Sequence, residues 1–311
     1  MALDSSSVSS RLGPLGLNFY AKLTSPVNPH WKSFNWRNLH FRNPLGIAGG
    51  VDKNARQILA WQHFGAGFIE IGTVTPEAQK ANPGTVILRD PHSRTLWNKL
   101  GFPNEGAIAI KNRIQKLPRP YQTPLFINIG KNRITPIEHA HVDYARLLRE
   151  FEDVADAFVI NISSPNTEGL RDLLKKENIH TFLSKVSKVQ NKVPLILKIS
   201  PDVDFAQLET LISASLENQI AGWVLTNTTL GRWPNSPYPR EGGVSGEFLR
   251  EHSREFLRSF IKLLGSRKAD KLVVSVGGVM SAEEVKVRLD LGADLVQVYT
   301  CLLYTSDAAD E

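Results

Sequence analysis

Five polar side chains stand at, or just after, the ends of apolar and β-branched runs: Lys53, Asn128, Asn161, Lys198 and Asn227. An asparagine amide offers a donor and an acceptor in one plane, whereas a lysine ammonium offers only donors. Together they suit a flat, polar, anionic ligand that carries amide and carboxylate groups. They do not suit metal-assisted hydrolysis, which needs clustered histidines or carboxylates.

The cysteine and histidine content excludes several kinds of site. Cys301 is the only cysteine, which excludes a disulfide framework, a thiolate zinc site and a CxxC redox motif. His139 and His141 are two residues apart in a predicted helix, so they point in different directions, and the sequence has no HExxH motif. We therefore expect no metal site.

The charge balance points to an anionic partner. Lys and Arg number 37 and Asp and Glu 31, which gives a net charge of +6. This balance favours an anionic ligand or an acidic membrane surface, and it is too weak to indicate a nucleic acid. No apolar run approaches the roughly 18 residues of a membrane-spanning helix.

Glycines follow the seventh of the predicted strands described below, at Gly277 and Gly278, and Tyr299-Thr300 ends the eighth. Loops at these two places of a barrel bind phosphate through backbone N–H groups. The segment 242–246 (GGVSG) is predicted to be a flexible loop before a helix. A planar cofactor that carries a phosphate fits this arrangement, and flavin mononucleotide (FMN) is the common one.

Eight short apolar runs alternate with helical patterns from residue 44 onward. Strands that alternate with helices indicate right-handed βαβ units and a parallel sheet. Eight of them predict an α/β fold of the (β/α)8 TIM-barrel type, with its site at the carboxyl ends of the strands; a doubly wound open sheet is the alternative. The strands are predicted at 44–50, 68–74, 124–130, 158–163, 194–200, 222–227, 272–278 and 295–300, and the clearest helices at 136–151, 171–190, 204–218, 247–264 and 281–290, the last beginning at Ser281.

Two segments depart from this repeat. Residues 85–102 are predicted to be an inserted β-hairpin that turns at 90–93. The eighth helix should follow Thr300, and residues 301–311 (CLLYTSDAADE) instead resemble a translated transposase sequencing adapter. We therefore expect a truncated gene product with a foreign tail at 301–311, the last helix missing, and an open seam in the barrel. The barrel domain is predicted to span 41–300, after a short N-terminal extension over 1–40.

The motif NISSPNT at 161–167 is highly specific, and the sequence around it closely resembles the class 2, quinone-linked dihydroorotate dehydrogenases. The resemblance runs from about residue 43 to residue 300. It is carried by NPLGIAGGVDKN (43–54), IEIGTVTP (69–76), NKLGFPN (98–104), INIGKN (127–132), NISSPNTEGLR (161–171), LKISPD (197–202), LTNTT (225–229), GGVSG (242–246), VSVGG (274–278) and VQVYT (296–300).

This resemblance implies an FMN enzyme that oxidises dihydroorotate to orotate in pyrimidine synthesis and passes the electrons to a quinone. Ser164 then corresponds to the general base, and Phe102 and Thr167 to residues that enclose a water relay beside it. A serine without a histidine partner needs burial and a proton relay to act as a base. Class 1 relatives and the transfer-RNA dihydrouridine synthases use a cysteine instead, and the sequence up to residue 300 has none.

The resemblance also implies the binding residues. Lys198 is expected to stabilise the negative charge of a reduced flavin ring, and residues 168–178 to form a lid over the substrate. The substrate-binding set is Lys53, Asn98, Lys99, Leu100, Gly101, Phe102, Asn161, Asn166, Asn227 and Thr228. The FMN-binding set is Gly49, Gly50, Val51, Asp52, Lys53, Thr73, Asn128, Asn161, Lys198, Thr226, Gly246, Gly278, Tyr299 and Thr300.

Family members of this class rest on a membrane through an N-terminal extension that also forms the quinone tunnel. We accordingly expect a monomer, peripherally bound to the inner face of a bacterial cytoplasmic membrane, or to the mitochondrial inner membrane in a eukaryote. The extension here is short, so the quinone site is the part with the least sequence support. Two alternatives stay open: another FMN barrel oxidoreductase with a different acceptor, such as fumarate or a nicotinamide, and an inactive flavin-binding fragment.

Overall fold

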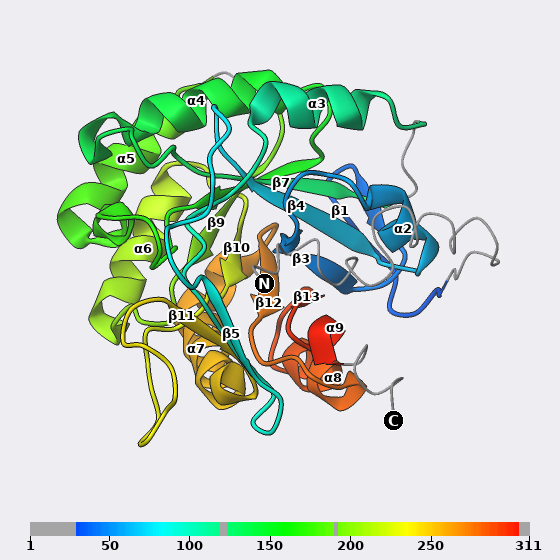
Figure 1. Cartoon of the computed structure of the whole chain (residues 1–311). Coiled ribbons are helices and arrows are strands. Elements are labelled where there is room, and N and C mark those ends of the chain that lie inside the picture. Colours follow the sequence, from blue (N-terminus) through cyan, green and yellow to red (C-terminus); the bar gives the residue numbers. More distant parts are fainter. Residues whose placement is uncertain (1–28, 119–122, 190–191, 305–311) are drawn as a thin grey trace.

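Eight parallel strands form a closed barrel in the computed structural model, which describes residues 29–118, 123–189 and 192–304 (Figure 1). All eight predicted strands are confirmed. Strand β13 pairs with β3 in parallel, with Gln297 opposite Gly46, so the expectation of an open seam is wrong. The ring contains, in order, β3 (Leu45–Asp52), β4 (Phe68–Val74), β7 (Leu125–Ile129), β8 (Ala157–Asn161), β9 (Leu195–Ile199), β10 (Gly222–Leu225), β12 (Leu272–Val276) and β13 (Leu295–Val298).

Helices surround this ring (Figure 1). Asp204 and Ser281 cap the starts of α6 and α8, because their side chains accept hydrogen bonds from Gln207 N and Glu284 N. Three predicted helices begin with a separate 3-10 turn, namely η2 (Ile137–His139), η3 (Leu170–Leu174) and η4 (Glu247–Leu249). The α-helices are α2 (Ile58–His63), α3 (Ala107–Gln115), α4 (Ala140–Phe151), α5 (Lys176–Ser187), α6 (Phe205–Glu217), α7 (Arg250–Leu264) and α8 (Ala282–Asp290), and a 3-10 turn, η5 (Gly265–Lys268), follows α7.

A hairpin that the sequence did not reveal packs at the amino-terminal end of the barrel. Strands β1 (Phe34–Trp36) and β2 (Leu39–Phe41) pair antiparallel. The Phe41 ring is fully buried, with centroids 6.1 Å from Phe68 and 6.2 Å from Phe126, near the starts of β4 and β7. These aromatic rings fill one end of the barrel, so polar side chains can gather only at the other end.

The predicted insertion is confirmed as a hairpin of β5 (Ile87–Asp90) and β6 (Thr95–Asn98). The expectation of a flexible loop at 242–246 is wrong, because β11 (Gly243–Gly246) pairs antiparallel with β6 and completes a three-stranded sheet. A Cβ atom on Gly243 would lie 1.9 Å from Thr228 Oγ1, so only glycine lets this strand approach the barrel.

A helix of four residues, α9 (Cys301–Tyr304), follows β13, where we expected none. Leu303 is buried, and the Tyr304 hydroxyl donates hydrogen bonds to the carbonyls of Asp90 and Thr95. The remainder of the predicted tail, 305–311, and the N-terminal residues 1–28 lie outside the described residues.

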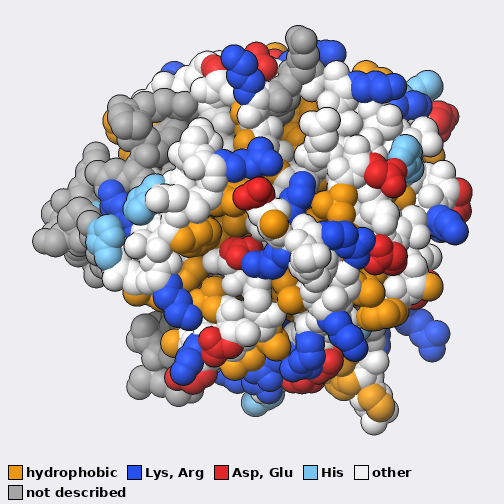
Figure 2. All heavy atoms as spheres, turned by 180° about the vertical axis from the view of Figure 1, so that it is seen from behind, with side chains coloured by type: hydrophobic (Ala, Val, Ile, Leu, Met, Phe, Trp, Pro, Cys, Tyr) orange, Lys and Arg blue, Asp and Glu red, His pale blue; other side chains and the backbone are white. Residues whose placement is uncertain are grey.

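Charge on the molecular surface is mixed. On the face seen in Figure 2, Lys and Arg side chains are dispersed, with Asp and Glu side chains among them. Within residues 29–118, 123–189 and 192–304, no helix is both long and apolar enough to span a bilayer.

Candidate active site

A cavity of about 950 Å³, including its open mouth, lies at the carboxyl ends of the barrel strands. This is the end at which TIM barrels carry their active sites. The predicted site residues that line it are Gly49, Gly50, Lys53, Thr73, Asn98, Leu100, Gly101, Phe102, Asn161, Ser164, Asn166, Lys198, Thr226, Asn227, Thr228, Gly278, Tyr299 and Thr300. Gly277, which belongs to the glycine pair predicted to bind phosphate, also lines it, and the remaining liners are Ala48, Leu96, Ser245, Leu249, Val276, Val279 and Gln297.

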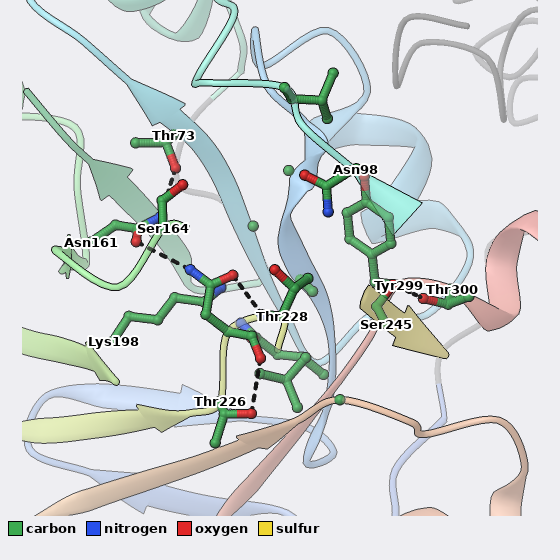
Figure 3. A pocket seen from close by; sticks show the side chains of 18 of the residues that line it. Thr73, Asn98, Asn161, Ser164, Lys198, Thr226, Thr228, Ser245, Tyr299 and Thr300 are labelled. Atoms are coloured by element: carbon green, nitrogen blue, oxygen red, sulfur yellow. Dashed lines mark hydrogen bonds between the residues drawn. The ribbon is translucent and has the colours of Figure 1, made fainter. Parts of the chain in front are cut away.

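A hydrogen-bond network fixes the amides at the ends of β4, β7 and β8. Thr73 Oγ1 donates to Asn128 Oδ1 at 2.6 Å, and Asn161 Nδ2 donates to Thr73 Oγ1 at 2.9 Å. Figure 3 shows Thr73 and Asn161 side by side. Asn161 Oδ1 accepts from Ser163 Oγ at 3.2 Å and from Asn227 Nδ2 at 3.4 Å. Because the amides of Asn128, Asn161 and Asn227 are joined to one another through these hydrogen bonds, the network forms a rigid polar wall of the cavity.

The loop after β8 places Ser164 in this wall, 4% exposed. Ser164 Oγ accepts a hydrogen bond of 3.2 Å from Asn166 N. Asn166 Nδ2 donates to Asn98 Oδ1 at 2.8 Å, which joins the loop to the inserted hairpin. Asn166 Oδ1 is buried without a hydrogen-bond partner among the described residues. A buried acceptor left in this state is satisfied by a ligand donor or by water.

Phe102 reaches the cavity through an unusual backbone turn. Its φ is +57°, next to Gly101 at +71°, and left-handed conformations are costly for an aromatic residue. Gln79 Nε2 holds the turn by donating to the carbonyls of both residues at 2.9 and 3.1 Å, and Asn104 Nδ2 donates to the Phe102 carbonyl at 2.9 Å. Strain of this kind gathers at functional sites, where the surrounding structure enforces it.

Two lysines present their ammonium groups at the cavity. Lys53 Nζ donates to the Gly50 carbonyl at 2.7 Å. Lys198 Nζ lies 3.6 Å from Glu70 Oε1, and Glu70 is fully buried. Glu70 was missed from the sequence, although a single acidic residue in the otherwise uncharged strand 68–74 (FIEIGTV) was the available signal.

The other side of the cavity has the features of a phosphate cradle (Figure 3). Ser245 Oγ and Thr300 Oγ1 lie 2.9 Å apart, beside Gly277 and Gly278, whose φ values are +111° and +69°. A Cβ on Gly278 would lie 2.3 Å from Arg250 Cα, at the start of α7. Successive left-handed glycines beside a helix start expose backbone N–H groups that bind anions.

A buried arginine braces this cradle from behind. Arg288 Nη2 donates to the Gly277 carbonyl at 2.9 Å and to Ser253 Oγ at 2.8 Å, and Ser253 Oγ donates to the same carbonyl at 2.7 Å. Burial lowers the pKa of Arg288, and the neighbouring Glu284 carboxylate opposes this. These hydrogen bonds hold the Gly277 carbonyl toward Arg288 and Ser253, and so away from the cavity.

Six predicted residues do not line the cavity: Val51, Asp52, Lys99, Asn128, Thr167 and Gly246. Asp52 instead accepts hydrogen bonds from Arg56 N at 2.8 Å and Gln57 N at 2.7 Å, and burial raises its pKa although these bonds oppose the shift. Lys99 forms an ion pair with Glu241.

The segment predicted as a lid, 168–178, is tied to two cavity loops by Arg171, which was also missed. Arg171 Nε donates to the Ser163 carbonyl at 2.9 Å, and its Nη2 to the Thr228 carbonyl at 3.1 Å. Its Nη1 pairs with Asp202 Oδ2 at 2.7 Å. Burial lowers the Arg171 pKa, and Asp202 opposes this shift. Among the described residues, no group of three His, Cys, Asp or Glu side chains could hold a metal ion.

Comparison with known proteins points to one family. The family model described as Dihydroorotate dehydrogenase matches residues 33–309. The chain is 38% identical over 302 residues to the "Dihydroorotate dehydrogenase (quinone)" of Clavibacter sepedonicus, covering 95% of this chain and 87% of that protein. It is 41% identical over 277 residues to the protein of the same name from Halorhodospira halophila, covering 86% and 80%.

Solved structures show the same fold. A ligand-free DHODH from Eimeria tenella superposes with a TM-score of 0.84 at 27% identity, covering 97% of this chain and 89% of that one. The DHODH of the same organism in complex with ferulenol gives a TM-score of 0.83, with 94% and 85% covered. With a barrel closed at one end, a cavity at the other, and relatives matched over most of their length, the chain belongs to the dihydroorotate dehydrogenase family.

Proposed function

We propose that this protein is a quinone-dependent dihydroorotate dehydrogenase that uses FMN and oxidises (S)-dihydroorotate to orotate in pyrimidine synthesis. The observation that carries the proposal is that one cavity holds Ser164 and Asn166 on one wall and the glycine cradle of Gly277 and Gly278 on another. Within the part of the chain that the structure describes, Asn166 Oδ1 is a buried acceptor without a partner. A cofactor phosphate and a polar ring can therefore occupy the same site.

The residues present fit FMN. The cradle of Gly277 and Gly278, with Ser245 and Thr300, would hold the phosphate. Lys198, Thr73 and Asn161 would face the ring, and the ammonium of Lys198 favours a ring that gains negative charge. When bound, FMN supplies a two-electron acceptor for the hydride that leaves the substrate.

The substrate would bind between Asn166 and Asn98 on one side and Asn227 and Thr228 on the other. The unpartnered Asn166 Oδ1 is suited to accept a hydrogen bond from a ring N–H of dihydroorotate. Lys53 supplies a positive charge for the substrate carboxylate. The Thr228 hydroxyl and the asparagine amides would then orient the dihydroorotate ring.

Ser164 would act as the base. In the oxidation, the carbon next to the ring carbonyl would lose a proton to Ser164 Oγ, whose own hydroxyl proton would pass to the water relay. The neighbouring carbon would lose a hydride to the cofactor, so that a C–C single bond becomes a double bond. Burial of Ser164 keeps bulk water away, and Phe102 closes the wall beside it. Thr167, which is buried and does not line the cavity, would support the proton relay.

We further propose that residues 1–40 contribute to quinone and membrane contact, that 41–300 form the catalytic domain, and that the protein acts as a monomer at a membrane surface. Support comes from the relatives named as quinone-dependent enzymes. A sedimentation assay with anionic phospholipid vesicles, comparing the full chain with a variant lacking 1–28, tests the membrane contact. Equal pelleting of the two proteins would contradict it.

One experiment tests the central proposal. The purified protein is loaded with FMN, and dihydroorotate is added without oxygen. We expect the yellow flavin absorbance to bleach, and a ubiquinone analogue to restore it faster than fumarate or NAD does. No bleaching would refute the oxidation of dihydroorotate, and faster recovery with fumarate or NAD would favour the alternative acceptor class.

A further inference from the structure

A fully buried carboxylate lies beneath the cavity floor and contacts three side chains. Glu70, in the middle of β4, is 3.6 Å from Lys198 Nζ through Oε1. Its Oε1 also accepts a hydrogen bond of 2.6 Å from Asn128 Nδ2, and its Oε2 accepts one of 2.6 Å from Gln297 Nε2. These partners come from β9, β7 and β13, so Glu70 connects four strands of the barrel.

The Glu70 carboxylate fits beside β3 only because residue 49 is a glycine. A Cβ atom on Gly49 would lie 2.2 Å from Glu70 Oε1 and 2.9 Å from Asn128 Nδ2. Gly49 itself lines the cavity. The carboxylate therefore lies directly against the backbone of a residue in the cavity wall.

Two of its partners belong to the cavity wall. Lys198 and Gln297 both line the cavity, and Gln297 Oε1 is a buried acceptor with no partner among the described residues. Because Gln297 Nε2 donates to Glu70, the free oxygen of the same amide is turned away from that carboxylate. Glu70 thus orients the Lys198 ammonium and the Gln297 amide in the cavity wall.

We propose that Glu70 is a positioning residue that holds Lys198 and Gln297 against the flavin and offsets the charge of Lys198, thereby lowering the reduction potential of the cofactor; this rests on the proposed function. Buried opposite charges at 3.6 Å interact strongly and are screened little by salt. A lysine free of its carboxylate would present its full charge to the ring and stabilise the reduced, more negative form.

The test uses the FMN-loaded full chain and two variants, Glu70→Gln and Glu70→Asp. Glu70→Gln keeps the size and removes the charge, while Glu70→Asp keeps the charge and moves it away from Lys198. The readouts are the midpoint potential and the affinity for sulfite, a nucleophile that adds to oxidised flavins and leaves negative charge on the ring. Neither readout depends on turnover.

We expect Glu70→Gln to bind sulfite about tenfold more tightly and to raise the midpoint potential by about 30 mV, the equivalent for a two-electron couple. Glu70→Asp should fall between wild type and Glu70→Gln. Glu209→Gln, which removes an exposed carboxylate paired with Arg267, is the control and should match wild type.

Wild-type values in both Glu70 variants, or equal shifts in both, would overturn the proposal, since equal shifts indicate packing and not charge. If Glu70→Gln folds but loses FMN while Glu70→Asp retains it, the charge is needed and the proposal stands; loss in both overturns it. If Glu70→Gln does not fold, the direction of the Glu70→Asp shift decides. Failure of wild type to bind FMN would refute the proposed function before any variant is compared.

Discussion

Asn166 Nδ2 donates a hydrogen bond of 2.8 Å to Asn98 Oδ1, and Asn166 Oδ1 is buried without a hydrogen-bond partner among the described residues. The contact joins the loop after β8 to strand β6 of the inserted hairpin. It also orients the Asn166 amide, because one of the two N–H donors of Nδ2 is held by Asn98 while Oδ1 keeps its acceptor capacity. The cavity wall is thereby prepared to accept a hydrogen bond from a ring N–H.

Replacing Asn166 by alanine should weaken orotate binding by about 10- to 100-fold, because the ligand loses an acceptor and Asn98 loses its donor. Orotate affinity is measured from its perturbation of the flavin spectrum. Asn218→Ala, at the carboxyl end of α6, is the matched control and should leave orotate affinity unchanged. Equal affinity in Asn166→Ala and wild type would remove Asn166 from the substrate site.

Ser164→Ala should slow flavin reduction by dihydroorotate about 10²- to 10⁴-fold at neutral pH while FMN stays bound, since the base is lost and the cradle is untouched. Stopped-flow absorbance measures the rate. Ser200→Ala is the control, because Ser200 Oγ follows the next strand and accepts from Asp202 N, outside the cavity wall. Near-normal reduction in Ser164→Ala would assign the base to another group.

Gly278→Ala should weaken FMN binding by about 100-fold or more, because the new Cβ meets Arg250 Cα at 2.3 Å and the φ of +69° resists a side chain. Fluorescence quenching of added FMN measures the affinity. Gly84→Ala separates the effect of the positive φ from the effect of the steric clash. Its φ is +79°, yet nothing lies within 4 Å of the added Cβ, so it should lose some stability and keep FMN affinity.

The stability of the fold should fall in acid partly through Glu105. Burial alone would raise its pKa, but hydrogen bonds from Arg56 and Arg113 outweigh this and hold the pKa below 4.5. Because the folded pKa is depressed, the stabilisation is present above the unfolded value and is lost as pH falls through the folded value. Glu105→Gln should therefore flatten the decrease in stability below about pH 4.5 and cost about 1 kcal/mol at pH 7.

Urea unfolding at a series of pH values measures this effect. Arg113 is also linked to Asn54, since its Nη1 donates to the Asn54 carbonyl at 2.5 Å, next to Lys53 in the cavity wall. The variant should therefore also loosen the loop that carries Lys53. An acid limb of unchanged slope in Glu105→Gln would contradict the assignment.

The sequence by itself determined the barrel and most of the cavity wall. Eight strand patterns were readable because each buried strand is a short apolar run between helical segments. The polar residues at the strand ends were found because parallel strands of a barrel deliver their carboxyl ends to one place. Motif resemblance then assigned Ser164 and the asparagines to one family.

Only the tertiary structure decided which groups act together across distant strands. The 242–246 segment becomes strand β11 because β6 offers it a partner 145 residues earlier in the chain, which no local pattern reveals. Asp52 was predicted to bind the cofactor, whereas the structure shows its carboxylate accepting hydrogen bonds from two backbone N–H groups of the loop before α2. The sequence did not reveal the role of Glu70 for the same reason. Its carboxylate pairs with Lys198, and these two distant residues come together only when the strands close into a barrel.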